Sequence, residues 1–181
     1  MGNKVFKADL SVESIENLKR QLLEYRNDEL PRKLTQFVKE LAEVGIPVID
    51  RNMEEASYTF DENGVQSGAD PSHYTYVKLN SFGSYAQATL IVEGKDLLFI
   101  EFGAGVSYNG AVGNSPHPKG KEFGFTIGSY GKGYGSRKVW GYYAEGGELV
   151  LTRGVKATMP VYEAEMEIIK SVTNVARKVF G

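Results

Sequence analysis

Glu101 is the carboxylate in this chain whose surroundings best fit a chemical role. It lies in an apolar run, beside Phe99 and Ile100, and a glycine-broken turn follows at Gly103–Gly105. A carboxylate at the end of a strand could serve as a general acid or base. It could equally cap the backbone amides around Gly103–Gly105 or pair with a nearby Lys or Arg. Because no second carboxylate stands at a fixed nearby spacing, we favour the structural role.

The two histidines and the lack of cysteine limit metal chemistry. His73 and His117 are the only histidines, and His117 stands between Pro116 and Pro118, where the backbone is held extended. A metal site needs further ligands that converge on the histidine, and none is close in sequence. The chain has no cysteine, which excludes disulfides, thiolate zinc sites and cysteine nucleophiles. We therefore expect both histidines in surface loops and no bound metal.

Motifs for cofactors and nucleophilic catalysis are also missing. The chain contains neither the GxxxxGK[ST] pattern of a phosphate-binding loop nor the GxSxG pattern of a hydrolase. The segment Gly131–Gly135 has two of the glycines of a dinucleotide fingerprint. It lacks the third and does not stand between a strand and a helix. The sequence predicts no cofactor.

The strongest functional signal is a loop rich in glycine, tyrosine and lysine. It spans residues 103–138, whereas most connections in compact domains take roughly 4–6 residues. Long loops are usually functional or disordered, and aromatic and basic side chains dominate the binding energy of protein interfaces. Basic residues mixed with aromatic ones could instead stack bases and neutralise phosphates, as in a small nucleic-acid-binding module that uses residues 119–143. A loop without a role is the third possibility. The candidate interface residues are Tyr130, Lys132, Tyr134, Arg137, Lys138 and Trp140.

Helices are expected on either side of the strands. Ser11 is a suitable N-cap, and an apolar stripe at helical spacing continues to Val44, where Gly45 and Pro47 are expected to stop it. Pro31 divides this region into two helices or kinks a single one. A last amphipathic helix is predicted after Thr158, its expected cap, with glutamates early and basic residues late. Its predicted buried face is Val161, Ala164, Ile168, Val172, Val175 and Val179.

The strands are expected between these helices. Residues 85–92 alternate with period two and are predicted to form an antiparallel hairpin with residues 97–102. A second hairpin is predicted from residues 139–143 and 149–152, because Gly146-Gly147 suits its turn. The order indicates an α+β fold, in which N-terminal helices and the C-terminal helix pack on an antiparallel sheet. We expect a single domain over residues 1–181, with the loop 103–138 inserted between strands.

The composition and net charge limit the classes of partner that this protein can bind. The chain has 181 residues, a formal net charge of -2 and a sequence pI near 5.8. This balance does not fit a protein whose whole surface binds nucleic acid or anionic lipid. The N-terminus is too short and polar for a signal-peptide core, and no run approaches the ~18 apolar residues of a membrane helix. A soluble protein made in the cytoplasm, with no membrane partner, is therefore expected.

Three segments together resemble a known family. They are Phe99–Gly105, Trp140–Tyr143 and Thr152–Pro160, in this order, after N-terminal helices and before a C-terminal helix. In this combination the chain resembles the tail-component family of long-tailed bacteriophages, the neck or tail-completion proteins of the HK-ninety-seven type. The resemblance covers most of the chain, although its motifs lie after residue 97.

The resemblance implies an α+β subunit of the virion at the head–tail junction, without enzymatic activity. Copies of such a subunit form a ring around the DNA channel and contact the adjacent head–tail connector and tail-tube proteins. DNA passes through without sequence-specific binding. A mildly negative net charge agrees with that role, since adhesion to DNA comes from phosphate neutralisation by Lys and Arg.

Overall fold

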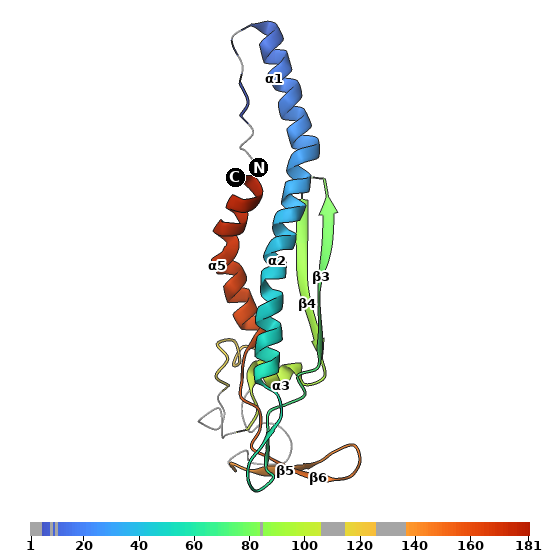
Figure 1. The fold of residues 1–181 in the computed structure, drawn as a ribbon, viewed down its shortest axis with the longest axis vertical. Coiled ribbons are helices and arrows are strands. Elements are labelled where there is room, and N and C mark those ends of the chain that lie inside the picture. Colours follow the sequence, from blue (N-terminus) through green and yellow to red (C-terminus); the bar gives the residue numbers. More distant parts are fainter. Residues whose placement is uncertain (1–4, 8, 10, 84, 106–114, 126–136) are drawn as a thin grey trace. The chain divides into compact units, whose positions relative to one another are not determined.

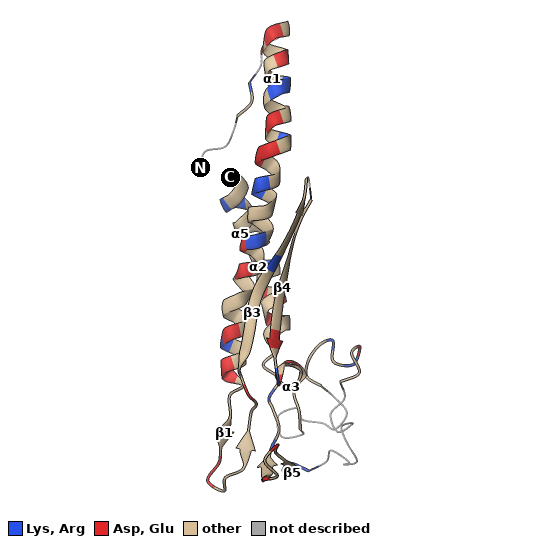
Figure 2. Ribbon diagram, turned by 90° about the vertical axis from the view of Figure 1, so that its right-hand side faces the viewer, with Lys and Arg blue, Asp and Glu red and all other residues tan. Residues whose placement is uncertain are grey.

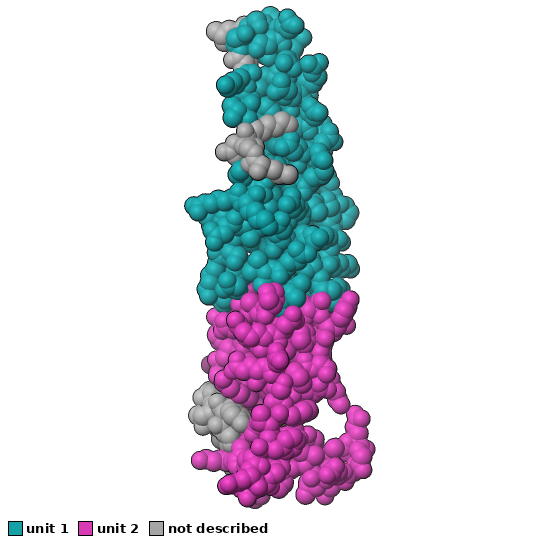
Figure 3. All heavy atoms as spheres, in the orientation of Figure 1, with its two compact units in different colours: residues 1–46, 76–91, 165–181 teal, residues 47–75, 92–164 magenta. Residues whose placement is uncertain are grey.

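The computed structural model describes residues 5–7, 9, 11–83, 85–105, 115–125 and 137–181. The chain divides into two compact units, and each combines segments that are distant in sequence (Figure 3). Unit 1 consists of residues 1–46, 76–91 and 165–181, and unit 2 of residues 47–75 and 92–164. Both contain helices and strands, which confirms a mixed α+β fold. None of the described helices combines the length and the apolar character needed to cross a membrane.

The N-terminal helical region is one run of three segments (Figure 1). These are α1 (Val12–Glu24), the π-helical turn η1 (Tyr25–Glu29) and α2 (Leu30–Glu55). The predicted cap is confirmed, because the Ser11 hydroxyl accepts a hydrogen bond from Ser14 N–H at 3.2 Å. None of the residues of α1 is buried, and Figure 2 shows basic and acidic residues mixed along it.

The break between the two helices is a widened turn that precedes Pro31. Leu30 N–H donates to Tyr25 O, five residues back, which is the π-helical pattern. Proline supplies no N–H, and in α2 it stands in the first turn, where helices tolerate it. The Arg32 side chain donates to the Asp28 carbonyl at 3.1 Å and so satisfies one backbone acceptor of this turn.

The predicted helix end at Gly45 and Pro47 is wrong. Helix α2 continues to Glu55 with Pro47 inside it, although an internal proline costs roughly 3 kcal/mol. The residues beyond Pro47 explain why. Ile49 and Met53 are fully buried in unit 2, and burial of two large apolar side chains offsets such a cost.

Unit 1 packs α2 against a hairpin and the C-terminal helix. Strands β3 (His73–Phe82) and β4 (Tyr85–Gly94) form a two-stranded sheet, and the two-residue connection between them requires antiparallel pairing. The strand predicted over 85–92 is thus confirmed, but its partner is β3. Helix α5 (Pro160–Phe180) lies beside α2 in unit 1, where Phe37 and Phe180 have ring centroids 5.6 Å apart (Figure 1).

Residues 97–102, predicted as a strand, form a helix in unit 2. Helix α3 (Leu97–Phe102) exposes Leu98 and Phe99 and buries Ile100, Glu101 and Phe102. A short apolar run does not distinguish a buried strand from a buried helix. Here Phe99 and Ile100 N–H both donate to the Asp96 carbonyl and Gly103 N–H to the Phe99 carbonyl, so helical hydrogen bonds prevail.

The sheet of unit 2 has four short strands in the order β1-β2-β6-β5. They are β1 (Thr59–Phe60), β2 (Gln66–Ser67), β5 (Trp140–Tyr143) and β6 (Leu149–Thr152). The second predicted hairpin is confirmed, since β5 and β6 pair antiparallel from Trp140↔Thr152 to Tyr143↔Leu149. A single antiparallel sheet is not found, because β2 pairs parallel with β6 and β3-β4 forms a separate sheet.

Candidate functional site

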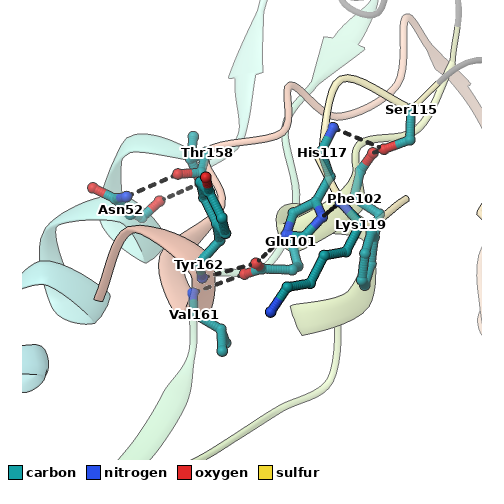
Figure 4. A network of polar contacts seen from close by, with 9 residues as sticks. All are labelled: Asn52, Glu101, Phe102, Ser115, His117, Lys119, Thr158, Val161 and Tyr162. Atoms are coloured by element: carbon teal, nitrogen blue, oxygen red, sulfur yellow. Dashed lines mark hydrogen bonds and ion pairs between the residues drawn. The ribbon is translucent and has the colours of Figure 1, made fainter. Parts of the chain in front are cut away.

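The carboxylate of Glu101 is buried in unit 2, and both of its oxygens accept hydrogen bonds (Figure 4). Its Oε2 accepts from Val161 N–H at 2.8 Å, and its Oε1 accepts from Tyr162 N–H at 3.0 Å. These amides belong to the first turn of α5, whose N–H groups have no partner within the helix. Because the helix dipole is positive at this end, a buried negative charge is stabilised there. Glu101 therefore caps α5 from a segment 60 residues away in the chain.

His117 is the third partner of this carboxylate. Its Nε2 lies 3.0 Å from Glu101 Oε1, and its Nδ1 accepts Lys119 N–H at 3.0 Å. Since the Lys119 amide can only donate, Nδ1 carries no proton and Nε2–H donates to the carboxylate. The hydrogen bonds thus assign a neutral imidazole in one tautomer. His117 is 6% exposed, so its predicted place in a surface loop is wrong.

This arrangement favours a structural role for Glu101. A general base needs a free lone pair within reach of a proton that it abstracts. Neither ring nitrogen of His117 has one, and both oxygens of Glu101 accept hydrogen bonds from donors of the protein itself. The prediction that Glu101 caps the amides around Gly103–Gly105 or pairs with a Lys or Arg is wrong, because the amides that it caps are those of Val161 and Tyr162.

Part of the predicted loop 103–138 belongs to the core of unit 2. The rings of Phe102 and Phe125 stack in parallel with centroids 3.9 Å apart, and His117 packs against Phe102 at 4.6 Å. The Ser115 hydroxyl donates to the Phe102 carbonyl at 2.6 Å. Residues 115–125 are thus tied to α3 through two ring contacts with Phe102 and a hydrogen bond to its backbone carbonyl. An interface role cannot be assigned to this stretch as a whole, because its inner side chains hold the subunit together.

A second polar pair fixes the entry to α5. Asn52 donates from its side-chain amide to the Thr158 carbonyl at 2.8 Å, and the Thr158 hydroxyl donates to the Asn52 carbonyl at 2.7 Å. The prediction that Thr158 caps α5 is wrong, because its hydroxyl bonds to α2 instead. Ala164 and Val179 of α5 are buried, whereas Val161 and Val172, also predicted on its buried face, are exposed.

The three segments that carry the resemblance meet in unit 2. Ala104 and Val155 form an antiparallel bridge, with N–H···O distances of 2.9 and 2.8 Å in the two directions. Gly154 has φ +97, and a Cβ there would lie 2.1 Å from the Ala104 carbonyl oxygen. Trp140 is the register partner of Thr152. Glycine is therefore required where the turn after α3 crosses the end of β6.

The predicted interface residues are only partly described. Tyr130, Lys132 and Tyr134 lie outside the described residues. Arg137, Lys138 and Trp140 are all exposed and stand at the start of the β5-β6 hairpin. Large apolar residues of this hairpin are exposed on both of its faces, and together they are here called the hairpin surface: Trp140 and Tyr142 on one face, and Tyr143, Leu149 and Leu151 on the other.

His73 is held differently from His117. Its Nδ1 lies 2.8 Å from the Pro71 carbonyl oxygen and its Nε2 lies 2.8 Å from Asp50 Oδ1. Both neighbours are acceptors, so the doubly protonated ring satisfies both contacts and the neutral ring only one. Burial opposes protonation, but the Asp50 carboxylate and the Pro71 carbonyl outweigh it and raise the pKa of His73.

No alternative chemistry emerges from the part of the chain that the structure describes. Among those residues, no group of three or more His, Asp or Glu side chains is arranged to hold a metal ion. Comparison of the chain with protein-family models, with curated proteins and with solved structures found no match. The proposals below therefore stand on the residues and their geometry, together with the three segments described above.

Proposed function

We propose that this chain is a structural subunit of a tailed-phage virion at the head–tail junction. Copies of it would form a ring around the DNA channel and contact the adjacent connector and tail-tube proteins. The three resembling segments, the α+β fold and the closed polar network around Glu101 all support this proposal.

The observation that carries the proposal is the amount of large apolar surface left exposed. Phe60, Phe82 and Tyr143 are each at least two-thirds exposed, and Trp140 is 41% exposed. The hairpin surface combines Trp and Tyr with two leucines, and a basic segment, Arg137-Lys138, precedes it. Such a composition is typical of the core and anchors of a protein interface.

Electron microscopy of particles tests the proposal. We would delete the gene in the phage that encodes it and image the lysate by negative stain, with wild-type complementation as the control. The expected result is filled heads separate from tails, or tails with an abnormal end. Normal, joined and infectious particles would overturn the proposal.

The alternative, a nucleic-acid-binding module that uses residues 119–143, has a separate measurement. Purified protein would be titrated with short single-stranded DNA at low and at high salt. Binding that weakens steeply with salt would favour the alternative, because it reports phosphate neutralisation. The ring subunit proposed here would bind such DNA weakly at any salt concentration.

A further inference from the structure

Among the residues that the structure describes, strand β5 has one edge without a neighbouring strand, and this edge has the properties of a pairing site. Within the described residues it is the last strand of the order β1-β2-β6-β5, and all four of its residues are exposed. Natural edge strands are usually protected from other chains by charges, proline or a bulge. The sequence of β5, Trp-Gly-Tyr-Tyr, contains none of these and runs in unbroken register with β6.

The hydrogen bonds around the hairpin show which backbone groups point outward. Ala144 N–H donates to the Glu148 carbonyl at 2.9 Å, so the backbone N–H and C=O groups of Ala144 point toward the returning strand. Residues whose backbone groups point in this direction are said here to face β6. In an antiparallel pair such residues alternate, so Trp140 and Tyr142 also face β6. Arg153 N–H donates to the Gln66 carbonyl on β2, which agrees with Thr152 facing β5. The N–H and C=O groups of Gly141 and Tyr143 therefore point to the open edge.

We propose that this edge pairs with the same edge of a second copy of the chain, antiparallel, with Gly141 at the two-fold axis. In this register Gly141 faces Gly141 of the second copy, and Tyr143 faces its Val139. Each outward N–H and C=O then meets another outward group. A shift by one residue would place outward groups opposite groups that already bond to β6.

The charges at the two ends of β5 favour a second copy over an unrelated strand. Arg137 precedes the strand and Glu145 follows it, and each is four residues from Gly141. Antiparallel pairing about Gly141 brings Arg137 opposite Glu145 of the second copy, and the pair occurs twice. Glu145 has a partner, Lys95 at 3.5 Å, but this pair is largely exposed and costs little to rearrange.

Side-chain packing agrees with the same register. Trp140 would stand opposite Tyr142 of the second copy at a position without ladder hydrogen bonds, where side chains approach most closely. On the other face, Leu149 and Leu151 lie over Gly141, 3.1 and 3.4 Å from the place of an added Cβ. Two copies would therefore join their leucine and Tyr143 surfaces into one continuous apolar patch across the axis.

This contact goes beyond the proposed ring. A two-fold contact uses the same patch on both copies, so it makes pairs and cannot by itself close a ring. The ring interface must then lie elsewhere on the subunit, and the β5 contact would hold copies in pairs or join two rings.

Single-cysteine cross-linking tests the register, because the natural chain has no cysteine. Gly141→Cys should form a disulfide dimer under mild oxidation, since directly opposed Cα atoms lie about 5.5 Å apart. Tyr143→Cys is the matched control. Its two thiols would be about 13 Å apart along the strand and should not cross-link. Equal cross-linking at both positions, or none at Gly141→Cys, would overturn the register.

Exchange of the two charges tests whether the strand that pairs with β5 belongs to a second copy of the chain. Sedimentation equilibrium of the full chain should show a dimer, and Arg137→Glu or Glu145→Arg should weaken it roughly tenfold. The double variant should restore it, whereas Glu148→Arg, at the same turn but outside the pairing, should change it little. A chain that is monomeric at every concentration would overturn the proposal and indicate a strand from a different protein. That result would leave the head–tail function untouched, because particle joining is measured independently.

Discussion

Glu101 and His117 are hydrogen-bonded to each other at 3.0 Å, and every remaining polar atom of the two side chains also has a protein partner. A carboxylate–histidine pair is often the beginning of a catalytic site. Here both ring nitrogens and both carboxylate oxygens are used to join α3, residues 115–125 and the start of α5. The pair fixes three segments of unit 2 in one arrangement.

Removal of the Glu101 carboxylate should destabilise the protein markedly. Glu101→Ala leaves three donors without their acceptor, and we expect a loss of about 3 kcal/mol in the free energy of unfolding. Glu101→Gln should cost about 1–2 kcal/mol, because its amide oxygen can still accept from one α5 amide, while its NH₂ in either orientation faces an N–H of Val161 or Tyr162. Urea denaturation measures both, with the exposed Glu145→Ala as the control. Equal stability of Glu101→Gln and wild type would contradict the hydrogen-bond assignment.

The His73–Asp50 contact should make stability depend on pH. The pKa of His73 is raised in the folded state, so its contribution is complete below the unfolded pKa of about 6.5 and is lost as pH rises through the folded pKa. The free energy of unfolding should therefore fall as the pH rises from the unfolded pKa through the raised pKa of His73. Urea midpoints across this range measure it. Asp50→Asn should flatten the decline, and an undiminished decline in that variant would exclude His73 as its source.

Phe125 should matter to stability far more than its neighbour Phe123. Phe125 stacks on Phe102 at 3.9 Å, whereas Phe123 is 59% exposed and touches the same ring edge-on at 6.0 Å. We expect Phe125→Ala to cost about 2–3 kcal/mol and Phe123→Ala less than about 1 kcal/mol. Thermal melts of the two variants decide whether residues 115–125 belong to the core. Equal melting temperatures would place this stretch outside it.

Gly154 should not tolerate a side chain. It combines a positive φ with a carbonyl oxygen 2.1 Å from the place of a Cβ, so Gly154→Ala should lose at least about 2 kcal/mol. Gly146→Ala, where an added Cβ meets nothing within 4 Å, is the matched control and should be close to neutral. Urea denaturation of both variants makes the comparison. A stable Gly154→Ala protein would show that the Ala104–Val155 bridge can open at little cost.

Trp140 should be needed for the particle rather than for the fold. It is 41% exposed on the hairpin surface, so Trp140→Ser should change the melting temperature little. In the complementation assay the same variant should leave heads and tails separate, since aromatic anchors dominate interface energies. Trp140→Phe keeps an apolar ring and should restore part of the joining. Full joining by Trp140→Ser would remove this residue from the interface.

The sequence predicted the elements whose signals are local. The Ser11 cap, the strand 85–92 and the Gly146-Gly147 hairpin depend on neighbours a few residues away, and all three are present. The helix over residues 97–102 was missed, because six apolar-rich residues fit both periods. The extension of α2 beyond Pro47 was missed because burial of Ile49 and Met53 overrides the local preference.

No pattern of residue types in the sequence indicated the polar network around Glu101 and His117. Glu101 and His117 are 16 residues apart in the sequence. The amides of Val161 and Tyr162 are 60 and 61 residues from Glu101. Backbone amides are the same in every residue, so no pattern of residue types indicates which of them a carboxylate will cap. The flanking prolines of His117 suggested an extended surface segment, yet the ring is among the most buried polar side chains.

The division of α5 between the two units has a consequence for biosynthesis. Residues 160–164 belong to unit 2 and residues 165–181 to unit 1. Neither unit is therefore complete until α5 has been synthesised. During translation the amides that Glu101 caps do not yet exist, and Phe37 lacks its partner Phe180. The nascent chain must therefore keep its apolar segments from aggregating until synthesis reaches α5. A stop codon before residue 160 should therefore yield a chain that chaperones retain and proteases degrade.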